Sequence, residues 1–256
     1  MGVKLADLVT KKPVSFDELA GKRIALDFSN SAYQFLSSIR QPDGTPLMDK
    51  QGRITSHLVG VWSLFTNLLQ MDIKLAVVLD GIPPVHKQTE AAIRYARKEQ
   101  AEEKYLAAKE EEDTEMMGRY AKQFTRLTKE MTHEAEELLH AMGIPVIQAP
   151  QEADAQIAYM NKQDDVWGCG SSDYDCLLHG APRLINNLTL SQRRRLPSGA
   201  VIKITPELLE LQTVLEEHQI TRDQLIYIAL LVGTDYNSGV HGIGPKKALN
   251  LVKKHQ

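Results

Sequence analysis

The sequence is poor in the residues that build disulfide-stapled or membrane-spanning proteins. It has two cysteines in 256 residues, Cys169 and Cys176. Neither has another Cys or His at metal-finger spacing, which excludes a disulfide framework and a structural zinc site. No apolar run reaches the ~18 uncharged residues that cross a bilayer, and the first twelve residues lack the apolar stretch of a signal peptide. We therefore expect a protein that is not secreted and has no membrane partner.

An excess of charge of one sign is also missing. The chain has 30 Lys+Arg against 33 Asp+Glu, a formal net charge of -3. A surface that binds a polyanion must therefore come from local segregation of charge. Aromatic residues make up only 6%, but hydrophobic residues make up 43%, enough to bury a sizeable core. This length fits one large domain or a domain with an insertion.

Short β-rich runs alternate with longer helical patterns, which is typical of an α/β fold with a mostly parallel central sheet flanked by helices. Strands are predicted at residues 23–26, 74–79, 144–148, 165–169 and 183–186. Helices are predicted at residues 29–40, 56–69, 152–161, 206–212, 222–232 and 245–254. Residues 192–195, which include three consecutive arginines, are predicted to form a basic turn.

Residues 86–142 interrupt this alternation. They are rich in Ala, Glu, Lys, Arg, Gln and Met, which are strong helix formers, and Gly118 is the only breaker between Lys87 and Glu134. We expect two or three charged helices that stand off the sheet. Considered alone, such a segment is equally well a solvated helical hairpin without a special function.

Carboxylates gather where the predicted strands end or the next helix begins. Six acids occupy such positions: Asp27, Asp80, Glu152, Asp154, Asp173 and Asp175. Parallel sheets bind ligands at the carboxyl ends of their strands, and like charges in one cleft need cations to hold them. Oxygen-only ligands favour Mg²⁺ or Mn²⁺ over zinc. A single acid of this kind is more often a helix cap or a turn residue, but six together indicate a metal site.

The spacing within the two acidic pairs predicts different roles. In extended backbone, Asp173 and Asp175 face the same way and can address one metal. Glu152 and Asp154 open a helix, where a two-residue step turns the side chain by roughly 200°. Both reach one cleft only at an irregular first turn or through water. Glu152 is therefore the better supported direct ligand of the two.

Six segments, read together, closely resemble the flap endonucleases, the archaeal and eukaryotic branch of the structure-specific 5′-nuclease superfamily. They are residues 26–36, 77–84, 149–156, 172–178, 232–236 and 242–248. They occur in the family's order and spacing across essentially the whole chain, and the likeness is greatest to an archaeal member. The last segment alone indicates only a helix-hairpin-helix-type DNA contact. The resemblance implies a PIN-like 5′-nuclease fold in a single domain over residues 1–256.

The resemblance also assigns the active site. Seven acids match the family's metal ligands: Asp27, Asp80, Glu152, Asp154, Asp173, Asp175 and Asp235. The implied cofactor is Mg²⁺, two ions per active site, which Mn²⁺ can replace. Lys87 and Arg94 match the catalytic basic pair on the family's gateway helix, and their spacing of seven places both on one helical face. Without this context, both are ordinary solvated charges.

The DNA-binding residues follow from the same resemblance. Tyr33 matches an aromatic residue on which a nucleobase stacks, although a tyrosine buried between helix and sheet is a competing interpretation. Gly2 resembles a near-terminal glycine beside the active site. Residues 86–132 match the helical arch, and residues 222–254 match a helix-two-turn-helix that grips duplex phosphates. The matching positions there are Gly242, Gly244, Lys246 and Lys247, with K⁺ expected at the Gly242–Gly244 turn.

The implied function is that of a Mg²⁺-dependent hydrolase, a 5′-flap endonuclease and 5′-3′ exonuclease acting on branched DNA in replication and repair. One alternative is another nuclease of the superfamily, acting as an exonuclease or at bubbles and junctions. The compact insertion favours the flap enzyme over it. A second is a non-catalytic DNA-structure-binding relative, against which the seven acids argue. A third is a smaller acidic-cluster ribonuclease, which should lack the insertion and residues 242–248.

Three features depart from the family's pattern. Asp154 stands where Glu is common, so its carboxylate has a shorter reach. His241 stands where Lys or Arg is common, which makes that contact weaker or pH-dependent. Residue 256 follows directly after the DNA-gripping helix, whereas relatives continue to a peptide that binds the sliding clamp. We expect clamp binding only in a longer form, and a location in the cytoplasm or nucleoid of an archaeon or in a eukaryotic nucleus.

Overall fold

A seven-stranded sheet forms the centre of the computed structural model, which describes residues 3–41, 44–110, 116, 120, 125–189, 193–195 and 201–254. The strands are β1 (Lys12–Pro13), β2 (Arg23–Asp27), β3 (Lys74–Leu79), β4 (Val146–Gln148), β5 (Gly168–Gly170), β6 (Arg183–Asn186) and β9 (Glu207–Glu210). Their order is β1-β9-β6-β5-β2-β3-β4. The five strands from β6 to β4 run parallel, while β9 pairs antiparallel with both β6 and β1. The expected mostly parallel sheet is confirmed.

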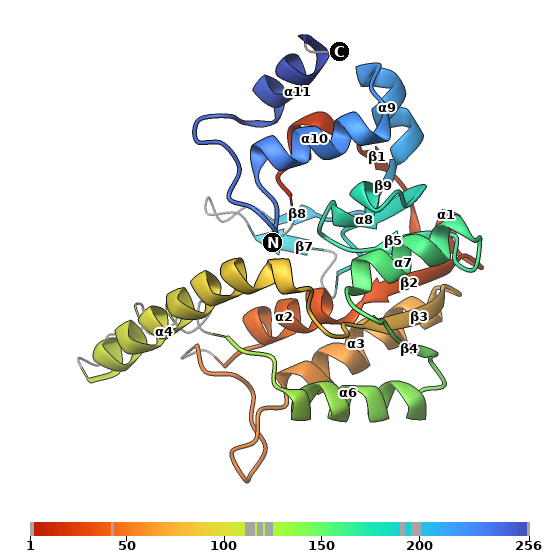
Figure 1. Cartoon of the computed structure of the whole chain (residues 1–256). Coiled ribbons are helices and arrows are strands. Elements are labelled where there is room, and N and C mark those ends of the chain that lie inside the picture. Colours follow the sequence, from red (N-terminus) through yellow and green to blue (C-terminus); the bar gives the residue numbers. More distant parts are fainter. Residues whose placement is uncertain are drawn as a thin grey trace.

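Helices cover both faces of the sheet (Figure 1). One group consists of α2 (Phe28–Ser38), α3 (Ser56–Gln70) and α6 (Lys129–Ala141). The other consists of α7 (Ala153–Lys162), α8 (Asp175–Leu178) and α10 (Arg222–Val232). Strand β2 separates two apolar clusters, because Ala25 joins the second group while Ile24 and Leu26 join the first. Buried on both faces, the central strands read as continuous apolar runs.

Four further helical elements precede, separate or follow these helices along the chain. They are η1 (Ala6–Leu8), α1 (Phe16–Leu19), α9 (Leu211–His218) and α11 (Pro245–Lys254). Helix α11 packs against α10, beyond the second helical layer (Figure 1). Within the described residues, no helix has the length and apolar character needed to cross a membrane.

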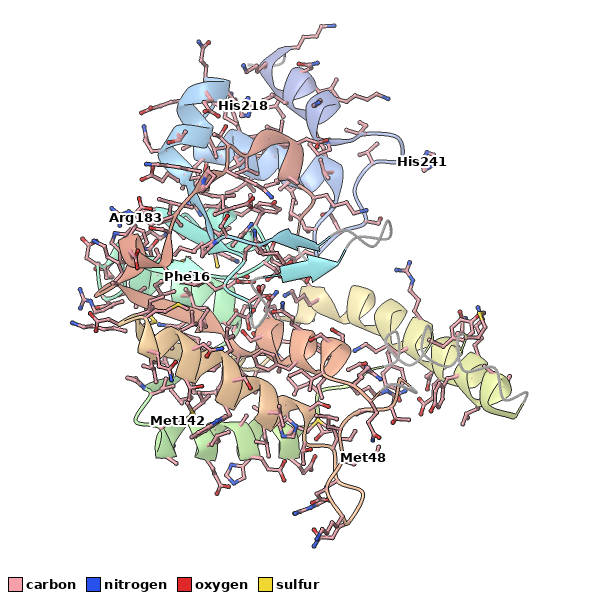
Figure 2. The ribbon with its side chains drawn as sticks, turned by 180° about the vertical axis from the view of Figure 1, so that it is seen from behind. Phe16, Met48, Met142, Arg183, His218 and His241 are labelled. Carbon is pink, nitrogen blue, oxygen red and sulfur yellow. The ribbon has the colours of Figure 1, made fainter. Side chains whose placement is uncertain are left out.

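A long charged helix projects from the body in both views (Figures 1 and 2). This is α4 (Gln88–Glu110), which begins after the 3₁₀ turn η2 (Val85–Lys87). The Arg126 guanidinium fastens the returning chain to it, lying 3.0 Å from Glu102 and 4.8 Å from the ring centre of Tyr95. Of the expected charged helices, α4 stands off the sheet as predicted. Helix α6 does not, because it packs against α3 and buries Ala135 and Leu139 in the core. Residues 111–115, 117–119 and 121–124 lie outside the described residues.

Two expected elements were wrong. The helix predicted at residues 206–212 is instead strand β9, followed by α9 from Leu211. Leu208 and Leu209 are buried in opposite clusters, as alternate residues of a strand are, so pairing with β6 overrides the helix propensity. The predicted basic turn is also a strand, β7 (Arg193–Arg195), paired antiparallel with β8 (Val201–Lys203); Gln192 lies outside the described residues.

Candidate active site

The predicted acids meet where the parallel strands end. Asp27 is the last residue of β2 and Asp80 directly follows β3. Glu152 and Asp154 lie at the start of α7, while Asp173 and Asp175 follow β5. Because parallel strands end at the same edge of a sheet, topology alone places these carboxylates together. Asp235, which follows α10, joins them through its electrostatic effect on Glu152 and Asp175.

Asp27 has a structural role as well as its place in the cluster. Its Oδ1 accepts a hydrogen bond of 3.1 Å from the backbone N–H of Asn30 and caps α2. The side chain is buried, and burial raises its pKa well above the ordinary value, with further increases from Asp154 and Asp80. The Asn30 side-chain amide also donates to Oδ2 of Asp173 at 3.1 Å. Asn30 therefore links the ends of β2 and β5.

Asp80 anchors the start of α7. Its Oδ1 accepts a hydrogen bond of 2.9 Å from the backbone N–H of Ala153, the first residue of that helix. The next residue must be small, because a Cβ on Gly81 would lie 2.2 Å from the carbonyl oxygen of Ala149. The close approach of these two chain segments brings the acid after β3 to the acids of α7.

The irregular helix start that Glu152 and Asp154 require is present. Glu152 is the extended N-cap residue of α7, with φ -92° and ψ 136°, and Asp154 lies in the first turn. Burial and neighbouring acids, Asp154 and Asp175 foremost, raise the pKa of Glu152 to about 7. Burial also raises the pKa of Asp154 to about 7, against the lowering effect of a hydrogen bond from Cys176. Ionisation of either carboxyl group is therefore disfavoured, and a bound divalent cation would offset that cost.

Cys176 donates that bond, with its Sγ 3.0 Å from Oδ1 of Asp154. The cysteine is fully buried at the start of α8. A hydrogen bond with Cys169, burial and the charge of Asp154 all raise the pKa of the Cys176 thiol. The group therefore stays protonated and acts as a donor toward the carboxylate.

Asp173 and Asp175 do not share one extended segment, so that expectation was wrong. The backbone N–H of Asp173 donates to the Ser171 hydroxyl at 3.1 Å, and the chain then turns into α8, which begins at Asp175. Oδ1 of Asp175 accepts a hydrogen bond of 3.0 Å from the backbone N–H of Val3. The N-terminal segment thus reaches the acids at Val3, while the position expected for Gly2 lies outside the described residues.

Lys87 places a positive charge among the acids. Its Nζ forms an ion pair with Oε1 of Glu152 and lies 3.7 Å from Oδ2 of Asp235. The Tyr236 hydroxyl donates to Oε2 of the same Glu152, and the Lys87 Nζ lies 5.4 Å from the centre of the Tyr236 ring. The other expected base, Arg94, lies in α4, and its side chain is outside the described residues.

The donor set fits a hard divalent cation. The grouped side chains offer carboxylate oxygens, and burial and mutual repulsion raise several of their pKa values. The Lys87 ammonium already compensates part of this charge. Across the described residues, no three His, Cys, Asp or Glu side chains are gathered as a ready-made metal site. The described acids therefore lie close enough to raise one another's pKa values, but not at the distances of metal ligands.

A cavity of about 250 Å³ adjoins the acids on the side of α10. Glu152, Asp154, Asp175 and Asp235 form one part of its wall. The rest of the wall combines apolar residues, Val3, Leu178, Ile226, Ala229 and Leu230, with the polar side chains of His179, Arg222, Thr234 and Tyr236.

Tyr33 is exposed, so the interpretation that it is buried between helix and sheet was wrong. It lies on α2 with 41% of its surface accessible. The Lys98 Nζ of α4 lies 4.6 Å from its ring centre. An aromatic ring of α2 and a lysine of the projecting helix α4 therefore face each other.

The glycine-rich turn precedes α11, which begins at Pro245 as predicted. Gly242 adopts φ +77°, a conformation that favours glycine, and its carbonyl accepts a hydrogen bond of 3.1 Å from the Lys247 ammonium. No atom lies within 4 Å of a Cβ built on Gly242 or Gly244, so the turn is open to a close approach. Lys246 is exposed on the same helix. His241 points away from the body on this loop (Figure 2).

The sequence analysis missed four contributors: Asn30, Cys176, Tyr236 and the backbone N–H of Val3. Tyr236 directly follows Asp235 in the matched segment 232–236, so its place beside a predicted ligand was a signal that could have identified it. Asn30 stands three residues after Asp27, the spacing of a helix cap. Only the fold brings Val3 to Asp175.

Two family models match the chain: the XPG N-terminal domain over residues 1–101 and the XPG I-region over residues 143–235. Together with the sheet and its edge of carboxylates, these matches define an XPG-type nuclease. Flap endonuclease 1 of Thermococcus onnurineus is 50% identical over 256 residues, which cover 99% of this chain and 75% of that protein. The protein of the same name from Staphylothermus marinus is 52% identical over 262 residues, with 100% and 75% covered.

Solved structures agree with the sequence matches. Flap endonuclease-1 of Methanococcus jannaschii has a TM-score of 0.77 and 44% identity, covering 99% of this chain and 78% of that one. The catalytic core of Rad2 in complex with DNA substrate has a TM-score of 0.72 and 26% identity, covering 99% and 68%. This chain belongs to the flap endonuclease family. The expected family and PIN-like nuclease fold are confirmed.

Proposed function

We propose that this protein is a Mg²⁺-dependent 5′-flap endonuclease with 5′-3′ exonuclease activity, acting on branched DNA in replication and repair. The observation that carries the proposal is the cluster of seven coupled carboxylates at the carboxyl edge of the sheet. It occurs in a chain about half identical to archaeal proteins named flap endonuclease 1. The reaction is hydrolysis of a phosphodiester near a flap–duplex junction.

The seven acids would hold two divalent ions. Asp27 and Asp80 come from the ends of β2 and β3, Glu152 and Asp154 from the start of α7, Asp173 and Asp175 from the turn between β5 and α8, and Asp235 from the loop after α10. The chemistry that such ions supply is activation of a water molecule and neutralisation of charge at the scissile phosphate. The protein contributes fixed carboxylates, because Asn30, the Ala153 N–H and the Val3 N–H each hold one of them in place.

Lys87 and Arg94 would act on the phosphate. The Lys87 ammonium now neutralises Glu152, and a bound cation would free it to turn toward the substrate. Lys87 ends the turn η2 directly before α4, so a helix that contacts the flap would carry a catalytic charge at its base. Arg94, in α4, would act on the same phosphate.

The remaining elements would bind DNA. Residues 86–132 would form the arch around the 5′ single strand, and the exposed Tyr33 ring would stack on a nucleobase beside the acids, with Gly2 close by. Residues 222–254 would grip the duplex through Gly242, Gly244, Lys246 and Lys247. A K⁺ ion at the Gly242–Gly244 turn would replace the ammonium that the Gly242 carbonyl now binds. Binding of a sliding clamp stays a prediction for a longer form.

A labelled double-flap DNA tests this proposal. We expect Mg²⁺-dependent cleavage near the junction when the 5′ end is free, and strong inhibition when a bulky group blocks that end. Cleavage within single-stranded DNA regardless of any junction would contradict the proposed specificity. Binding without cleavage, in the presence of Mg²⁺ and Mn²⁺, would instead favour the non-catalytic relative.

A further inference from the structure

We propose that Cys176 is a positioning residue that orients the Asp154 carboxylate toward a divalent cation. This inference rests on the proposed metal-dependent nuclease function. The thiol lies 3.0 Å from Oδ1 of Asp154, and among the described residues no other side chain hydrogen-bonds that oxygen. A carboxylate has two oxygens, so a bond that occupies Oδ1 leaves Oδ2 available to coordinate a cation.

The setting of Cys176 favours orientation over simple packing. Its side chain is wholly buried, so no water competes for the carboxylate on that side. It lies in α8, directly after Asp175, while Asp154 lies in α7. The bond therefore joins two helices that each carry an acid of the cluster. Ligands are commonly fixed in this manner by outer hydrogen bonds, whose removal costs roughly 10- to 100-fold in metal affinity or activity.

The short Asp154 side chain makes such a bond more important. Asp places its carboxylate near the backbone, and the Cys176 Sγ also lies 3.7 Å from the Asp154 backbone carbonyl. The thiol thus contacts both ends of the residue. Neighbouring acids repel the Asp154 carboxylate and favour its rotation away from the cluster. The uncharged thiol on the buried side opposes that rotation, because it holds Oδ1 by a hydrogen bond.

The test compares Cys176→Ala, which removes the donor, with Cys176→Ser, which keeps one. Titration calorimetry with Mn²⁺ in the absence of DNA should show about 10-fold weaker binding for Cys176→Ala, the lower end of the known range for such contacts. Cys176→Ser should recover most of the affinity. Cys169→Ser is the matched control, because it changes the second buried thiol, 3.9 Å from Asn161 Oδ1, while its hydroxyl can keep the hydrogen bond with Cys176. The control should bind Mn²⁺ like the wild type.

A second background separates positioning from a general loss of structure. In an Asp154→Asn variant, the Cys176→Ala substitution should cause no further loss of Mn²⁺ affinity, because the group it orients no longer coordinates. Equal Mn²⁺ affinity for wild type and Cys176→Ala, or equal losses for Cys169→Ser and Cys176→Ala, would overturn the proposal. Failure of the nuclease function would appear differently, as intact Mn²⁺ binding in the wild type without cleavage of flap DNA.

Discussion

At the scale of single residues, the ionised acids of the site destabilise the folded protein. The acids share a buried edge, and each one raises the cost of ionising its neighbours. The fold tolerates them because each also has a local partner, such as the Ala153 N–H for Asp80 or the Val3 N–H for Asp175. Destabilised charge of this kind is a mark of functional sites, since it must be relieved by protonation or by a bound cation.

Asp80→Asn should separate catalysis from folding. The amide keeps an oxygen that can accept the Ala153 N–H bond but removes one negative charge. We expect Mg²⁺-dependent cleavage to fall by about 10²-fold or more, while affinity for flap DNA stays close to that of the wild type. Without metal, the variant should unfold at a higher temperature, because Asp80 raises the pKa values of Asp27, Glu152 and Asp154. Near wild-type cleavage would contradict the role of Asp80 as a ligand.

Stability without metal should fall as the pH rises. Glu152 and Asp154 have ordinary pKa values of 4.5 and 3.8, and both are raised to about 7 in the fold. The folded protein therefore binds more protons between about pH 4 and pH 7, and the stabilisation present below pH 4 is lost across that window. Urea unfolding in EDTA should show a higher midpoint at pH 5 than at pH 8. A Glu152→Gln, Asp154→Asn double variant is the control and should show a smaller difference.

At the scale of elements, the sequence predicted what depends on local pattern and on matched motifs. Helices α3, α10 and α11 begin at or within a residue of their expected starts, and the acids lie at the predicted strand ends. Strand β9 could not be predicted, because its Glu-Leu-Leu-Glu sequence suits a helix until β6 and β1 pair with it. The turn into α8 likewise depends on Ser171, which no spacing rule identifies. Long-range partners decided both cases.

Lys87→Ala should show that the start of α4 serves chemistry. The single-turnover cleavage rate should fall by roughly 10²-fold while the Kd for flap DNA changes little, because the charge acts mainly on the developing phosphate charge. Lys104→Ala is the control in α4, the helix that follows Lys87; its Nζ lies 5.9 Å from the Tyr120 ring centre, far along the helix from the acids. It should leave the rate of bound substrate unchanged. Equal losses of rate and affinity in Lys87→Ala would make this lysine a general phosphate contact.

The N-cap of α10 should matter for stability but not for chemistry. The Thr221 hydroxyl accepts the Gln224 N–H at 3.2 Å, and the Gln224 side chain accepts the Thr221 N–H at 2.8 Å, a complete capping box. Thr221→Ala should lower the free energy of unfolding by about 1 kcal/mol, measured by urea denaturation. Thr221→Ser is the control and should restore most of it. The cleavage rate of bound DNA should remain that of the wild type, since α10 carries none of the proposed ligands.

At the scale of the whole molecule, the near-zero net charge conceals a separation of signs. The acids are withdrawn into the sheet edge, while α11 exposes Lys246, Lys247, Lys253 and Lys254 at the far end of the second helical layer (Figure 1). A polyanion can thus be held by the lysines while its phosphate approaches the acids through bound cations. Binding strength and cleavage should accordingly depend on different parts of the fold.

A salt titration tests this division of labour. In an Asp80→Asn background, which should leave the substrate uncut, the logarithm of the affinity for flap DNA should fall linearly with the logarithm of the salt concentration. Adding Lys246→Ala should lower the slope by roughly 0.9, the value for one lost phosphate contact. Asp80→Asn alone should leave the slope equal to that of the wild type measured in EDTA, because acid removal changes no phosphate contact at α11.

In the active enzyme, Lys246→Ala should weaken binding but preserve the single-turnover rate at saturating protein, since α11 lies apart from the acids. An unchanged slope in Lys246→Ala, or a saturating rate that falls with affinity, would show that α11 does not serve as the separate duplex grip.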